Sequence, residues 1–121
     1  MDLSGLITVV QRVLDDTERE YGQMPFFVRP MVKRGFTRRT GRDFAAWRAV
    51  LASAARGQIE PALRDALDQL ADHYRGAPER ARRGMGATGA QLAIVEQRSR
   101  ERAEAALALR AALDCQVSPA G

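Results

Sequence analysis

Apolar residues recur at three- and four-residue spacing along most of this chain, and that period limits the fold more than any other feature. Runs with this spacing occupy residues 44–54 and 63–74 as well as the amino-terminal part of the chain, and each would place one apolar stripe on a helix. No segment shows the apolar–polar alternation of a half-buried β-strand. The sequence therefore predicts an all-α fold. The clearest run joins Leu3, Leu6, Ile7, Val10, Val13 and Leu14.

A chain of 121 residues has the length of one domain. We expect residues 1–115 to form a single helical domain and residues 116–121 to form a disordered tail. Short helical turns are predicted at 30–33 and 78–83, because a proline stands at the start of each. The predicted bundle has four principal helices, at about residues 2–20, 41–56, 61–75 and 89–113.

The start of the second long helix carries a capping signal. Thr40 and Asp43 form the pattern T-x-x-D, which predicts that the Thr40 hydroxyl caps the helix. Phe44 and Trp47 then begin its buried face. The paired aromatics Phe26 and Phe27, in the proline-containing segment before it, are expected to fill one end of the core.

The last helix is unusually long, and its end, AALALRAAL at residues 105–113, is apolar almost all round. A helix of this kind needs burial on more than one side. It should therefore lie centrally in the bundle or pack against a second copy of the chain. We predict a homodimer in which Leu107, Leu109 and Leu113 take part in self-association.

Positive charge is concentrated in one part of the chain. The net charge is +4, but residues 29–58 alone carry +7, whereas residues 1–28 carry −3 and residues 59–76 carry −2. The segment RPMVKRGFTRRTGRDFAAWR, residues 29–48, holds seven basic residues and one acid. We predict an anion-binding surface on it for a partner, formed by Arg34, Arg38, Arg39 and Arg42.

Two functions fit this segment. The first is a protein-binding module, such as a regulator, inhibitor, adaptor or assembly subunit, whose partner is acidic. The second is nucleic-acid binding, in which arginines contact phosphates and Phe36 stacks on a base. The small net charge favours a protein partner. A third reading gives the arginines no partner outside the chain, because they could pair with its own acidic helices.

Catalytic and metal chemistry has little support in the sequence. His73 is the single histidine and Cys115 the single cysteine, so a two-histidine metal site and an internal disulfide are excluded within one chain. We expect His73 to be partly buried and hydrogen-bonded near a helix end. The acids Asp15, Asp16 and Glu20 could gather around Mg²⁺, but a solvated acidic helix end is the simpler expectation. No catalytic, metal-binding or cofactor-binding residue is predicted, and the chain is not expected to be an enzyme.

Gly84, Gly86 and Gly89 stand in the spacing G-x-G-x-x-G, which in dinucleotide-binding folds follows a β-strand. Here a charged helical turn precedes the glycines. We therefore interpret them as a joint between helices. The amino-terminal residues lack the pattern of a secretory signal, and no run approaches the roughly 20 apolar residues of a membrane span. With a single cysteine, this predicts a cytoplasmic protein without membrane contact.

Overall fold

The computed structural model describes residues 2–117, and within them every regular element is a helix. This confirms the predicted all-α class. The described chain contains six helices: α1 (Leu3–Gly22), α2 (Arg29–Thr40), α3 (Phe44–Ala55), α4 (Leu63–Arg75), α5 (Ala77–Met85) and α6 (Gly89–Val117).

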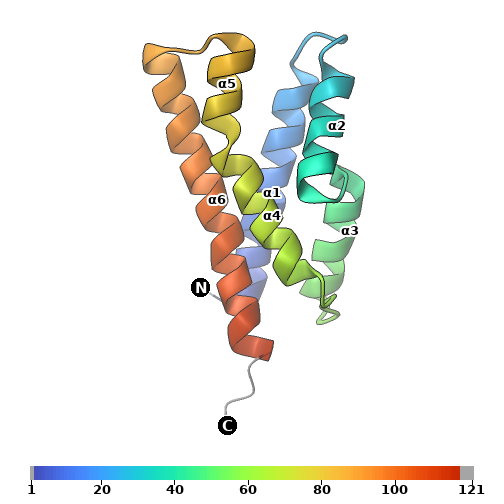
Figure 1. Ribbon diagram of the computed structural model, residues 1–121. Helices are drawn as coiled ribbons and strands as arrows, with labels where there is room; N and C mark the ends of the chain where they lie inside the picture. The colour runs from blue at the N-terminus through green and yellow to red at the C-terminus, as the bar shows by residue number, and fades with distance from the viewer. Residues whose placement is uncertain (1, 118–121) are drawn as a thin grey trace.

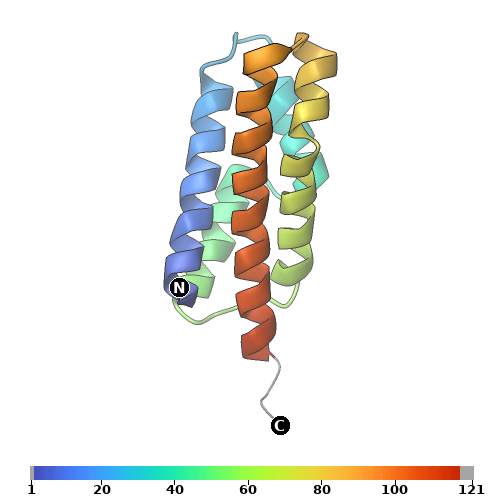
Figure 2. The same ribbon diagram turned by 90° about the vertical axis from the view of Figure 1, so that its left-hand side faces the viewer.

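The helices form an up-and-down bundle (Figures 1 and 2). α1 runs toward one end of the bundle, and α2 and α3 return in sequence beside it. α4 and α5 then run end to end in the direction of α1, and the long α6 returns alongside them. The α1–α2 and α5–α6 connections consequently lie at the same end, which we call the loop end, opposite the amino terminus.

Six helices replace the four principal ones predicted, because α2 and α5 are full helices rather than short turns. α2 has 12 residues and α5 has 9. Apolar periodicity underestimated both, since Phe36 is the one large apolar side chain that α2 buries and Ala81 is the one residue that α5 buries.

The predicted cap at Thr40 is wrong, because this residue is the last of α2. The N-cap of α3 is Asp43, whose carboxylate accepts from the Ala46 amide at 2.8 Å. The Thr40 hydroxyl instead accepts from the indole N–H of Trp47 at 3.1 Å. Gly41, with φ 82°, ends α2 in the left-handed conformation that favours glycine. One short turn thus joins the two helices.

The apolar end of α6 lies in the core of the single chain, where it packs mainly on α4 and α1. Leu109 and Leu113 are completely buried and Leu107 is partly buried against the core. The burial that this segment requires is therefore met without a second copy. Self-association stays an untested prediction, and two of its three proposed residues do not reach the surface of one chain.

Residues 116 and 117, predicted to belong to a disordered tail, are part of α6, which continues through Val117. Residues 118–121 lie outside the described part of the chain. The expected position of Phe26 and Phe27 is also wrong. Their side chains are 78% and 71% exposed, because the α1–α2 connection carries them beyond the end of the core.

Replacing Leu109 by Glu should unfold the chain, because a carboxylate without a partner would enter the core. We expect a loss of at least about 3 kcal/mol in the free energy of unfolding. Far-UV circular dichroism during urea titration measures this loss. Ala108→Glu, at the exposed neighbouring position, is the matched control and should be nearly neutral. A folded Leu109→Glu chain that changes only in its oligomeric mass would contradict the core assignment.

Candidate partner-binding site

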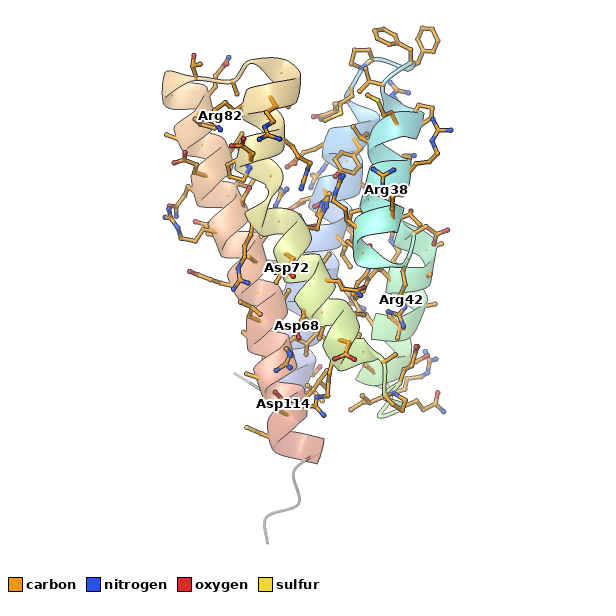
Figure 3. The ribbon with its side chains drawn as sticks, in the orientation of Figure 1. Arg38, Arg42, Asp68, Asp72, Arg82 and Asp114 are labelled. Atoms are coloured by element: carbon orange, nitrogen blue, oxygen red, sulfur yellow. The ribbon has the colours of Figure 1, made fainter. Side chains whose placement is uncertain are left out.

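The burial of Phe36 sets the direction of the charged side chains on α2. Phe36 is fully buried and stacks on Phe44, with ring centroids 4.2 Å apart and an interplanar angle of 8°. A residue two positions before or after it points to roughly the opposite side of the helix, since each residue turns the helix by about 100°. Arg34 and Arg38 occupy these positions and are exposed, as Figure 3 shows for Arg38.

We call three exposed cations of α2, Lys33, Arg34 and Arg38, the α2 basic face; Lys33 lies at its edge, because it stands three residues before Phe36. The helix has five cations and no acidic residue, and none of the five pairs with a carboxylate of the described residues. Two of the three acidic side chains of the neighbouring α4 have other partners: Asp72 pairs with Arg75 at 3.3 Å, and Asp68 pairs with Arg110 at 2.7 Å. The positive charge of this face therefore stays uncompensated within the described chain.

Two arginines that follow α2 in the chain, Arg42 and Arg48, do pair with carboxylates. Arg42 pairs with Glu60 at 2.5 Å, and its guanidinium lies 5.5 Å from the centre of the Trp47 ring. Arg48 binds both Asp15, at 3.1 Å, and Glu18 on α1. The expectation that the arginines pair with acids of their own fold thus holds for Arg42 and Arg48, whereas no cation of α2 pairs with a carboxylate of the described residues.

Arg39 turns inward, because it lies three residues after Phe36 and so on the same side of α2. Its Nε donates to Nδ1 of His73 at 3.1 Å. Of the four predicted partner-binding arginines, only Arg34 and Arg38 therefore form part of one exposed surface. Arg39 and Arg42 are half-buried and engaged elsewhere.

His73 is 3% exposed at the end of α4, so it is hydrogen-bonded as expected but more completely buried than the partial burial expected. Arg80 of α5, which sequence reasoning did not single out, reaches it from the other side. An Arg80 Nη2 donates to the His73 carbonyl oxygen at 2.6 Å and lies 3.4 Å from Nδ1. The Tyr21 hydroxyl lies 3.4 Å from Nε2. We call His73, Arg39, Arg80 and Tyr21 the histidine cluster.

Burial and the two adjacent guanidinium groups of Arg80 and Arg39 lower the pKa of His73 to about 3. The imidazole is therefore neutral near pH 7. Since Nδ1 accepts from Arg39, the hydrogen-bond pattern assigns the ring proton to Nε2. Burial, and then the charge of Arg39, likewise lower the pKa of Arg80, which nevertheless remains protonated.

Large apolar side chains gather beside the α2 basic face at the loop end. Phe26 and Phe27 lie in the α1–α2 connection, and Met31 lies in the first turn of α2 with 61% of its surface exposed. We call these three residues the loop-end patch. Met85 and Ile94, also exposed, flank the α5–α6 connection at the same end. Exposed apolar side chains that gather in one place are typical of interaction surfaces.

The acidic residues of α1 are engaged by arginines. Asp16 pairs with Arg19, and Glu20 pairs with Arg102 at 2.5 Å. Within residues 2–117, no three histidine, cysteine or carboxylate side chains are placed to hold a metal ion. The expectation of a solvated helix end is thus only partly right, because these carboxylates sit in ion pairs.

The glycine motif spans the junction of α5 and α6. Gly84 lies inside α5, Gly86 ends that helix at φ 65°, and Gly89 begins α6. No strand precedes the motif in the described chain, in agreement with its interpretation as a joint.

Comparisons of the chain with protein-family models, curated proteins and solved structures give no match. Its function must therefore be argued from its own residues. None of the helices described is long and apolar enough to span a bilayer.

The lowered pKa of His73 makes folding stability depend on pH. The unfolded chain binds a proton on this histidine near pH 6.5, whereas the folded chain does so only near pH 3. Stability should therefore fall as pH drops below 6.5, with a loss of about 2 kcal/mol between pH 7 and pH 5.

Urea unfolding followed by the fluorescence of Trp47, the single tryptophan, measures this dependence. The His73→Gln variant should show a shallower decline over the same range, whatever its stability at pH 7. Parallel declines in both proteins would contradict the assignment of the effect to His73.

Proposed function

We propose that this chain is a non-enzymatic protein-binding module. Its α2 basic face and loop-end patch would bind an acidic segment of a partner that also carries apolar side chains. One observation carries the proposal: α2 presents unpaired cations next to exposed phenylalanine and methionine side chains. Charge attracts and orients such a partner, and burial of the apolar side chains holds it.

Nucleic-acid binding through residues 29–48 is the second candidate, because Lys33, Arg34 and Arg38 could contact phosphates. It has less support. The aromatic side chains of this segment, Phe36, Phe44 and Trp47, are at most 5% exposed, so none of them can stack on a base. The pairing of Arg42 and Arg48 with carboxylates further reduces the charge available for phosphates.

Replacing Arg34 and Arg38 together by Ala should remove partner binding without affecting the fold. Both side chains are exposed and unpaired, so the melting temperature should stay within a few degrees of wild type. Affinity for the partner should fall at least about tenfold. The partner is isolated by affinity capture from the organism that encodes the chain, and its affinity is then measured by calorimetry.

The matched control is Arg12→Ala with Arg56→Ala, two exposed arginines outside α2 that also pair with no described carboxylate. It removes the same net charge and should leave binding nearly intact. Filter binding of an oligonucleotide at two salt concentrations tests the second candidate. Tight and steeply salt-dependent binding that depends on Arg34 and Arg38, with no captured protein, would overturn the proposal in favour of nucleic acid.

Replacing Phe26 and Phe27 by Ser should also weaken partner binding, because the complex would bury less apolar surface. Added salt screens charges and should not reproduce this loss of affinity. The free energy of unfolding should hardly change, because both rings are already mostly exposed. Calorimetry with the captured partner, together with thermal unfolding, separates these two effects. Unchanged affinity in this variant would restrict the interface to charge alone and remove the loop-end patch from the proposal.

A further inference from the structure

We infer that Arg39 and Arg80 form a binding site for a phosphate-class oxyanion beside Nδ1 of His73, separate from the α2 basic face. The two guanidinium groups come from different helices, α2 and α5, and each has a donor nitrogen within 3.4 Å of the same atom, Nδ1 of His73. Neither pairs with a carboxylate of the described chain. Two half-buried like charges repel each other, and a bound anion would relieve that repulsion.

Most donors of the two arginines are unused. Nδ1 of His73 has a single lone pair, so it cannot satisfy both side chains. Arg39 uses only Nε, and Arg80 uses only one Nη2 group, for hydrogen bonds to described residues. Arg39 keeps the fork of its two Nη groups, which matches two oxygens of a phosphate, and Arg80 keeps the N–H groups of Nε and Nη1 as separate donors.

Tyr21 lies at the other nitrogen of the His73 ring, Nε2. Because the ring proton of His73 is on Nε2, this N–H points its hydrogen toward the phenol oxygen, 3.4 Å away. The Tyr21 hydroxyl hydrogen is then left for another acceptor. Two guanidinium groups with free donors and no paired carboxylate suit a tetrahedral anion with more than one negative charge better than a single carboxylate.

Two glycines make room for these arginines. A Cβ atom added at Gly35 would lie 2.9 Å from an Nη of Arg39, and one added at Gly76 would lie 2.7 Å from an Nη of Arg80. Both guanidinium groups thus rest directly against helix backbone where a side chain would displace them. Neither glycine has a positive φ, so an alanine is compatible with the backbone at both positions.

Titration with inorganic phosphate tests the site, with the nuclear magnetic resonance signals of the His73 ring as the probe. His73 is the single histidine, so its signals need no assignment in a chain without a histidine tag. Ionic strength is held constant with chloride. We expect a saturable shift of the ring signals with phosphate, a similar one with a phosphate monoester, and a much weaker one with acetate.

Arg39→Gln and Arg80→Gln should each weaken phosphate binding by about tenfold or more. Arg38→Gln is the matched control, because it removes the same charge one residue away from Arg39, on the exposed face of α2. Gly35→Ala tests whether weaker binding could result from unfolding. Alanine favours the helix, while its methyl group should displace the guanidinium of Arg39. This variant should be at least as stable as wild type and still bind phosphate less tightly.

Three results would overturn the inference: no saturable shift with phosphate, equal weakening by Arg38→Gln, or wild-type affinity in both Gly35→Ala and Arg80→Gln. Tighter binding of acetate than of phosphate would show that the ligand is a carboxylate and would overturn the phosphate assignment. The outcome is independent of the proposed protein partner, because the Arg34 and Arg38 variant leaves both arginines of this site in place.

Discussion

The burial of the Phe36 ring of α2 determines which charged side chains this bundle exposes. Phe36 is the one large apolar side chain that the helix buries, and it lies among Phe44, Tyr21 and His73. With this ring in the core, the rotation of α2 about its axis is determined. Arg34 and Arg38 must then face solvent, and Arg39 must face the interior. A slip of one residue would turn the helix by about 100°, so these side chains would no longer point to the same sides.

How far the sequence could predict the fold varied between helices. α1, α3, α4 and α6 bury regular apolar stripes or long apolar segments, so their periodicity was sufficient. α2 and α5 are rich in arginine and bury very little, so they lack such a signal. Their formation depends on contacts with residues far away in the chain, such as the stacking of Phe36 on Phe44, and on left-handed glycine ends at Gly41 and Gly86.

The candidate site was predictable in composition but not in detail. Counting charges located the arginine-rich segment, yet it could not show that Arg42 meets Glu60 or that Arg48 meets Asp15. The inward turn of Arg39 could have been suspected from its spacing of three residues from Phe36. Its partner, His73, lies 34 residues further along. Arg80 could be recognised only after α4 and α5 were seen to run end to end.

The small buried face of α2 has an evolutionary consequence. Gly35, Phe36 and Thr40 are the residues that this helix buries, and Lys33, Arg34 and Arg38 stay exposed. Substitutions on its outer face would then cost little stability, so selection could change what the surface recognises while the scaffold stays the same. Such a division lets recognition diverge faster than architecture, and related chains would be expected to differ first at Lys33, Arg34 and Arg38.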